Sequence, residues 1–326
     1  MAALPEPIER LAGADFSAIA SAFAAAGFAV AQPARGIITV RRAGTVRPAV
    51  VLSVGVHGDE TGPIEMLAWE LDALAREPAA LAVDLMVCVG NLDAIAAGKR
   101  FIDADLNRMF RPERGSLAEA AESARADQLI AATDAFFAGA GPQRWHLDLH
   151  TAIRPSRYPA FAIVPELIAP EGQRRLIGWL GQAGIGAIIM NPKSAGTFSY
   201  YSAEHHGAMG STVELGRIGK LGENNLAQFA DARVALSNLL RGVGIDDQGR
   251  APAVFRVAQE VIKRSDAFTM AVGRETHNFT PLQRDAVIAT DGETTYRVQH
   301  DEELVVFPNP DVRVGLRAAL MVVRTV

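Results

Sequence analysis

The stretch "AVVLSVGVHGDETGPIEMLAWELDALARE", residues 49–77, joins an apolar run to an amphipathic segment through a short polar turn. Its first residues, 50–54, have the composition of a buried strand. The apolar residues that follow repeat with the spacing of one buried helix face, and Pro63 is tolerated in a first helical turn. These are Ile64, Leu67, Ala68, Leu71 and Leu74. The stretch therefore predicts a strand–turn–helix unit that exposes His57, Asp59 and Glu60 at the turn.

The same alternation continues from about residue 48 to 245, which predicts an α/β fold with a mixed, mainly parallel sheet flanked by helices. Further helices are expected at about 116–138 and 223–241. The strand candidates are "AVVLSVGV", "LAVDLMVCVGN", "WHLDLH", "AFAIVP", "IGAIIM" and "GSTVELG".

After "GVGIDDQGRAPA", residues 242–253, short strands separated by turn residues predict a smaller C-terminal β domain, with a turn at Asp291-Gly292. We expect an α/β domain over 1–247 and an all-β domain over 248–326. The sequence does not assign residues 1–45 to one of these domains, and they could pack with either domain.

Composition excludes several protein classes. The chain has 326 residues, 49% of them hydrophobic and 21% charged, and its net charge of −5 argues against nucleic-acid binding. The single cysteine, Cys88, excludes an internal disulfide and a Cys-rich zinc site and reads as a core residue. Neither a signal peptide nor a membrane span is expected. We expect a cytoplasmic protein, and a homo-oligomer is compatible with the sequence.

Histidines follow two predicted strands, where α/β sheets usually bind ligands. His57 and Glu60 share one tight turn, and alternation along "WHLDLH" places His146, Asp148 and His150 on one strand face. Two histidines and one glutamate are the ligand set of a hydrolytic zinc site. Asp148 could orient a ligating imidazole, and Asp59 could do the same or complement a helix start.

Spacing alone leaves another interpretation open. His-x-x-Glu is a weak signal, because "HDEE" at 300–303 matches it without a third partner. His57 could be a hydrogen-bonded turn residue, Glu60 a helix-start carboxylate and His150 a satisfied core histidine.

Two further stretches add candidates. "GKRFIDADLNRMFRPER" contains Arg100, Asn107 and Arg108, and an Asn-Arg pair beside a sheet end could hold a carboxylate. The alternative is a solvated basic loop. "TVELGRIGKLGENN" places Glu214 in an apolar strand, where a carboxylate is costly unless paired or functional. Glu214 is either a general base or a salt-bridged core residue.

Together, "GVHGDETG", "GNLDAIAAGKRFIDADLNRMF", "DLHTAIRPS" and "TVELGRIGKLGENN" resemble the succinylglutamate desuccinylase and aspartoacylase family, which is zinc-carboxypeptidase-like. The resemblance runs from about residue 48 to 240 and continues in the C-terminal stretches. It implies one Zn²⁺ ion held by His57, Glu60 and His150, with Glu214 as general base.

The resemblance also implies that Asn107 and Arg108 hold a substrate carboxylate and that Arg100 stabilises the oxyanion or binds substrate. The implied reaction is hydrolysis of N2-succinyl-L-glutamate, the last step of arginine breakdown by the succinyltransferase route.

Substrate choice depends on the residues that follow His150. Arg154 and Arg157 are candidate partners for an extra carboxylate, with surface arginines as the alternative. Desuccinylases typically have "HTAIRGS", whereas this chain has Pro155, which fixes φ and removes an N–H. We therefore expect a different loop shape. Tyr200 could line the pocket or lie in the core.

Two other function classes remain. One is an aspartoacylase-like enzyme, another N-acyl-amino-acid deacylase or a carboxypeptidase on the same scaffold. The other is a metal- or carboxylate-binding protein that has lost catalysis, against which Glu214 argues.

Overall fold

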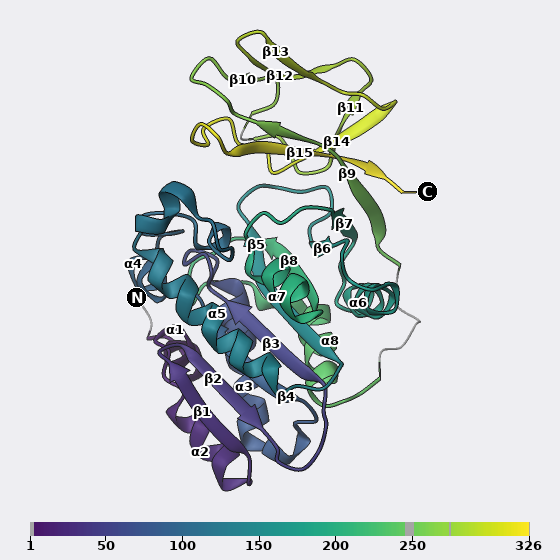
Figure 1. Ribbon diagram of the computed structural model, residues 1–326. Helices are drawn as coiled ribbons and strands as arrows, with labels where there is room; N and C mark the ends of the chain where they lie inside the picture. Colours follow the sequence, from purple (N-terminus) through teal and green to yellow (C-terminus); the bar gives the residue numbers. More distant parts are fainter. Residues whose placement is uncertain (1–2, 245–250, 274, 326) are drawn as a thin grey trace.

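The computed structural model describes residues 3–244, 251–273 and 275–325. A mixed sheet of twelve strands crosses the whole molecule (Figure 1). In spatial order the strands are β1 (Ala29–Ala34), β2 (Ile37–Arg41), β4 (Asp84–Val89), β3 (Ala49–Val54), β5 (Arg144–Ala152), β8 (Met209–Arg217), β6 (Phe161–Pro165), β7 (Ala187–Asn191), β9 (Ala253–Ile262), β15 (Arg317–Arg324), β14 (Glu302–Val306) and β11 (Thr280–Gln283). The neighbours β4, β3, β5 and β8 are parallel, which confirms the predicted α/β class.

Helices cover both faces of the sheet. One face packs against α1 (Glu6–Ala12), α2 (Ser17–Ala25), α3 (Gly62–Arg76), α4 (Leu92–Ala97), α6 (Pro170–Gln182) and α8 (Ala230–Leu240). The other packs against α5 (Glu122–Ala138) and α7 (Phe198–His206). Short 3-10 turns lie at Pro78–Ala80 (η1), Leu106–Arg108 (η2), Gly115–Glu119 (η3) and Leu226–Phe229 (η4).

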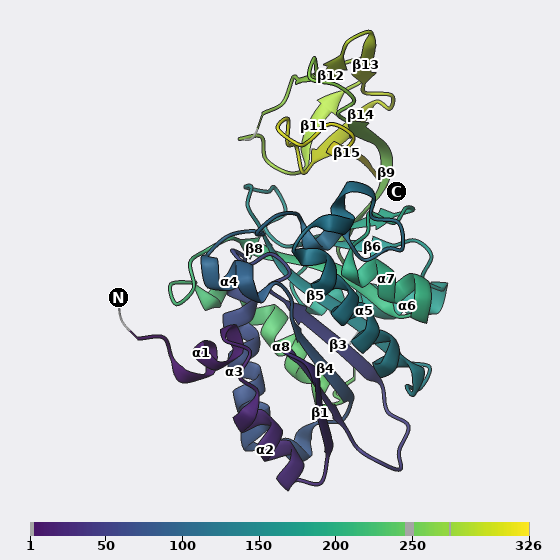
Figure 2. The ribbon, with the colours of Figure 1, turned by 60° about the vertical axis from the view of Figure 1, so that its left-hand side comes forward.

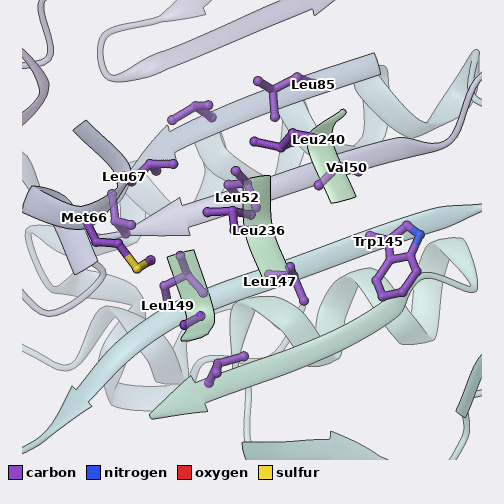
Figure 3. Packing of buried hydrophobic residues seen from close by; sticks show 14 of the residues in the cluster. Val50, Leu52, Met66, Leu67, Leu85, Trp145, Leu147, Leu149, Leu236 and Leu240 are labelled. Carbon is purple, nitrogen blue, oxygen red and sulfur yellow. The ribbon is translucent and has the colours of Figure 1, made fainter. Parts of the chain in front are cut away.

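Alternation along the central strands divides apolar from polar side chains. Leu52 of β3 and Leu147 and Leu149 of β5 point toward α8, where they lie near Leu236 and Leu240 in one buried cluster (Figure 3). Replacing one such leucine by alanine would cost about 2–5 kcal/mol. Because successive side chains point to opposite faces, the intervening polar residues of β3 and β5 face α5 and α7. That face therefore carries the chemistry.

Two predicted helices are shorter than expected. The helix predicted at about 116–138 begins at Glu122, since 115–119 form a separate 3-10 turn that ends at Ala120 in an extended conformation. The helix predicted at about 223–241 is divided between η4 and α8.

The N-terminal segment joins the α/β domain. Strand β2 pairs antiparallel with β4, and α1 and α2 pack against α3. These elements lie at the end of the molecule opposite to β12 and β13 (Figure 2). Of the two alternatives for residues 1–45, the structure therefore supports packing with the α/β domain.

The C-terminal β domain is an extension of the same sheet, which the sequence did not predict. Strand β9 pairs parallel with β7, and β15, β14 and β11 follow it. A second sheet contains β10 (Thr269–Met270), β12 (Val287–Asp291) and β13 (Thr294–Arg297). The predicted turn is confirmed, because β12 and β13 form a hairpin with Gly292 at a φ of 59°. The predicted boundary at 247/248 lies outside the described residues.

This domain contacts the α/β domain at the loop that follows β5. The N–H of Asn278 donates to the carbonyl of Pro155 at 2.9 Å, and the N–H of Arg157 donates to the carbonyl of Asn278 at 3.1 Å. Among the described residues, no helix has the length and apolarity needed to cross a membrane.

Candidate active site

His57, Glu60 and His150 are brought together at the carboxyl ends of β3 and β5. One ligand atom from each lies within 4.8 Å of the others, and all three side chains are buried. The Glu60 carboxylate lies 2.9 Å from Nδ1 of His57 and 2.8 Å from Nδ1 of His150. Burial would raise the pKa of Glu60, but the two histidines outweigh it and hold that pKa well below its usual range. The three side chains form a site that could bind a metal ion.

The turn that carries His57 and Glu60 depends on a glycine between them. The N–H of Glu60 donates to the carbonyl of His57 at 3.2 Å, which closes the turn. A Cβ at Gly58 would lie 2.3 Å from backbone atoms of Ala94 and Ile95, in a position that no side chain could occupy. The turn therefore packs directly on α4, and this contact fixes the direction of both ligands.

A chain of buried hydrogen bonds determines the tautomer of His150. Asp148 Oδ2 lies 2.8 Å from His150 Nε2, and Asp148 Oδ1 accepts the hydroxyl proton of Ser53 at 2.6 Å. Because Ser53 gives its only proton to Asp148, Nε2 of His146 must donate to Ser53, at 2.9 Å. Ser202 then donates to Nδ1 of His146 at 2.7 Å. At the other end, His150 donates to Asp148 through Nε2, so Nδ1, which faces Glu60, is the nitrogen that would bind a metal ion in place of a proton.

The pKa shifts along this chain agree with its hydrogen bonds. Burial lowers the pKa of His146 to about 4, so this imidazole stays neutral. Burial would raise the pKa of Asp148, but His150 outweighs it and lowers that pKa. Burial would likewise lower the pKa of His150, yet Asp148 and Glu60 raise it well above its usual value. Asp148 is therefore ionised and accepts the Nε2 proton of His150.

The partner of His57 is Asp105, which sequence reasoning missed. Asp105 Oδ1 lies 2.9 Å from Nε2 of His57 and also accepts the N–H of Asn107 at 2.9 Å. Asp59, for which this role was predicted, has a buried Oδ1 without a hydrogen-bond partner, and burial raises its pKa. The sequence could have indicated Asp105, because it lies two residues before the Asn107-Arg108 pair that was already assigned to the site.

The loop that carries Arg100 and Asp105 is held by a second residue that sequence reasoning missed. The buried carboxylate of Glu122, at the start of α5, accepts the N–H groups of residues 102, 103 and 104 at 2.6–3.3 Å. Asn91 adds a hydrogen bond to the same carboxylate at 3.2 Å. Hydrogen bonds to a buried carboxylate are strong, so Glu122 fixes the path of this loop.

Arg100, Asn107 and Arg108 lie around the candidate metal site of His57, Glu60 and His150 in different ways. Arg100 Nη1 donates to Glu60 Oε1 at 2.6 Å. Asn107 is buried, accepts the N–H of Phe198 at 2.8 Å and points its amide nitrogen toward Asp148 and His150 at 3.4 Å. Arg108 is partly exposed and donates to the carbonyl of Asn107 at 2.6 Å. Asn107 is buried, so of the predicted Asn107–Arg108 pair only the guanidinium of Arg108 is accessible to a substrate carboxylate.

Glu214 lies beside His150 because β5 and β8 pair in parallel with these two residues in register. Its side chain is 8% exposed, and its Oε2 is buried without a hydrogen-bond partner. Burial raises the pKa of Glu214 to about 7, and the nearby Glu60 adds to this effect. Among the two alternatives, a salt-bridged core residue does not fit this environment. A carboxylate with a pKa near neutrality suits general acid–base chemistry.

The remaining candidates for substrate binding are Arg154, Arg157 and Tyr200, and their contacts with the site are fewer. Arg154 is half-buried in the loop after His150, and Arg157 is exposed. Tyr200 is buried, and its pKa is raised by burial and then by Glu204 and Glu166. It lies two residues after Phe198, whose N–H donates to Asn107, but no hydrogen bond joins Tyr200 to a residue of the site among the described residues.

The comparisons with known proteins agree with this geometry. Residues 46–240 match the succinylglutamate desuccinylase/aspartoacylase catalytic domain, and residues 250–325 match the AstE/AspA barrel-sandwich hybrid domain. A succinylglutamate desuccinylase of Burkholderia lata is 44% identical over 285 residues, which cover 87% of this chain and 81% of the relative.

Solved structures show the same fold. The crystal structure of succinylglutamate desuccinylase from Vibrio cholerae is 33% identical, with a TM-score of 0.83 over 89% of this chain and 86% of that one. Murine aminoacylase 3, at 20% identity and a TM-score of 0.57, covers 87% of this chain and 97% of its own and shares the fold. This chain belongs to the succinylglutamate desuccinylase/aspartoacylase family.

Proposed function

We propose that this protein hydrolyses N2-succinyl-L-glutamate to succinate and L-glutamate with one zinc ion at His57, Glu60 and His150. In the family this reaction ends arginine breakdown by the succinyltransferase route. The observation that carries the proposal is the buried Glu214 carboxylate beside His150, whose Oε2 has no hydrogen-bond partner, in a chain 44% identical to a protein named succinylglutamate desuccinylase.

The residues present fit a zinc ion. Both histidines turn Nδ1 toward Glu60, and both Nε2 atoms face a carboxylate, Asp105 or Asp148, as expected behind metal-ligating imidazoles. Two nitrogens and one carboxylate with room for another ligand are the donor set of catalytic zinc. When bound, the ion would activate a water molecule and polarise the amide carbonyl.

Glu214 would carry the proton in this reaction. Its unpaired Oε2 can accept a proton from the attacking water and return it to the leaving amine nitrogen. Arg100, partly exposed beside Glu60, would donate to the oxygen that gains negative charge. Arg108 would hold a substrate carboxylate, while the buried Asn107 would keep the loop in position by accepting the N–H of Phe198 and donating to Asp148.

The test measures zinc content together with succinate release from succinylglutamate, and compares Glu214→Gln with Glu204→Gln, a matched change at an exposed position on α7. We expect both variants to retain zinc and only Glu214→Gln to lose most turnover. Near-normal turnover of Glu214→Gln would contradict the role of this residue. Acetylaspartate and a short peptide serve as competing substrates, and preference for either one would instead indicate another deacylase or a carboxypeptidase. A zinc-loaded wild-type protein that turns over none of them would indicate a binding protein.

A further inference from the structure

Residues 218–224 follow β8 and leave the sheet just beyond Glu214. In the β5–β8 ladder His150 pairs with Glu214, but the next pair is Ala152 with Arg217, so β8 carries one extra residue between the two pairs. In the β6–β8 ladder, Glu214 is also the residue of β8 at which pairing ends. Regular strand pairing therefore holds Glu214 only from its N-terminal side.

Beyond Glu214 the path of the chain depends on other contacts. Gly216 has a φ of 141°, a conformation that side chains rarely allow, and glycine adds backbone freedom at this point. One backbone hydrogen bond, from the N–H of Ile218 to the carbonyl of Ala152 at 3.1 Å, joins the segment to β5. The rest of the segment is held by side-chain hydrogen bonds at the start of α3.

Three side chains make these hydrogen bonds. The buried Oε1 of Glu65 accepts the N–H of Gly222 and the side-chain amide of Asn224, both at 2.6 Å. Thr61 donates its hydroxyl to the carbonyl of Gly219 at 2.9 Å and accepts the amide of Asn224 at 2.9 Å. We call Thr61, Glu65 and Asn224 the α3 clamp.

The α3 clamp joins the general-base strand to the turn that carries two candidate metal ligands. Thr61 directly follows Glu60, so its hydrogen bond to Gly219 ties that turn to the segment after β8. The contact is close, because a Cβ at Gly219 would lie 2.4 Å from Oδ1 of Asn224. The distance between Glu60 and Glu214 is therefore fixed from two directions, by the sheet and by the α3 clamp.

We propose that Glu65 is a positioning residue for the reaction, because through the α3 clamp it fixes Glu214 relative to the turn of His57 and Glu60. The inference rests on the proposed function, which assigns the proton transfers to Glu214. A displacement of about 1 Å of a catalytic group can cost about a hundredfold in rate. Since Glu65 is buried and bonds to the segment after β8, its loss should affect kcat and not KM.

The first test measures kcat and KM for succinylglutamate with zinc-loaded wild type, Glu65→Ala and Glu65→Gln. We expect Glu65→Ala to lower kcat by about tenfold to a hundredfold, with KM changed by less than about twofold. Glu65→Gln should recover most of the loss, because glutamine retains the oxygen that accepts both hydrogen bonds. Glu70→Ala is the matched control, since Glu70 is an equally buried carboxylate of α3 that pairs with Arg241. An unchanged kcat of Glu65→Ala, or an equal loss in Glu70→Ala, would overturn the proposal.

A double variant separates an effect through Glu214 from a general loss of structure. If Glu65 acts through Glu214, adding Glu65→Ala to Glu214→Gln should lower kcat much less than Glu65→Ala does alone. Effects that multiply would show an independent role and overturn the proposal. Asn224→Ala breaks the α3 clamp at a half-buried loop position and should reproduce the kcat defect with KM unchanged.

A last measurement needs no turnover. Amide hydrogen exchange in residues 218–224 should be about tenfold faster or more in Glu65→Ala than in wild type, Glu65→Gln or Glu70→Ala. Equal exchange in all four proteins would overturn the α3 clamp itself. Absence of wild-type desuccinylase activity would contradict the proposed function, while the exchange rates would still decide whether Glu65 holds the segment.

Discussion

Replacing Glu214 by glutamine should remove most turnover and at the same time stabilise the metal-free protein. Loss of a general base reduces kcat by about a hundredfold to ten-thousandfold. The pKa of Glu214 rises from 4.5 to about 7, which corresponds to a cost of about 3 kcal/mol for the ionised form in the folded state. Because the folded-state pKa is raised, this cost is absent below the unfolded pKa and complete above about pH 7. Glutamine does not ionise and avoids it.

The assay is urea unfolding of chelator-treated wild type and Glu214→Gln at about pH 5 and about pH 8. We expect the difference in unfolding free energy to favour the variant by about 3 kcal/mol near pH 8 and by less than about 1 kcal/mol near pH 5. Glu204→Gln, at an exposed site, should show no such change with pH. If the difference for Glu214→Gln were the same at both pH values, Glu214 would not be the destabilised buried carboxylate described here.

Three further predictions concern the groups around Glu214. His146→Leu should weaken zinc binding by about tenfold to a hundredfold in a chelator competition, whereas Ser199→Ala, on the same face but outside the chain, should not. In the metal-loaded enzyme, kcat/KM should increase as the pH rises through the pKa of Glu214, which a bound cation would lower from the metal-free value of about 7, because Glu214 must be ionised to accept a proton, and a profile without an acid limb would contradict this. Glu122→Ala should lower the free energy of unfolding by about 3 kcal/mol in urea and reduce kcat, and unchanged values would show that its carboxylate does not hold the loop.

Much of the candidate metal site could be predicted from the sequence, because its residues occur in short local patterns. A turn of four residues places His57 and Glu60 together, and strand periodicity places Asp148 and His150 on one face. The motif resemblance then connected these residues to Glu214. The same local reasoning selected Asp59 and overlooked Asp105, since hydrogen bonding between a loop and a distant turn leaves no periodic pattern.

By itself, the sequence indicated the α/β class, the strand–turn–helix unit at residues 49–77, the candidate metal ligands His57, Glu60 and His150, and the β character of the C-terminal segment. Only the tertiary structure decided that β8 lies beside β5 and so places Glu214 level with His150. It also decided that β9 extends the sheet of the α/β domain by pairing with β7. Periodicity fixes which face of a strand a side chain occupies, whereas strand order depends on packing between residues far apart in the chain. Local chemistry and the family motifs were therefore readable in advance, whereas the strand order that brings these residues together was not.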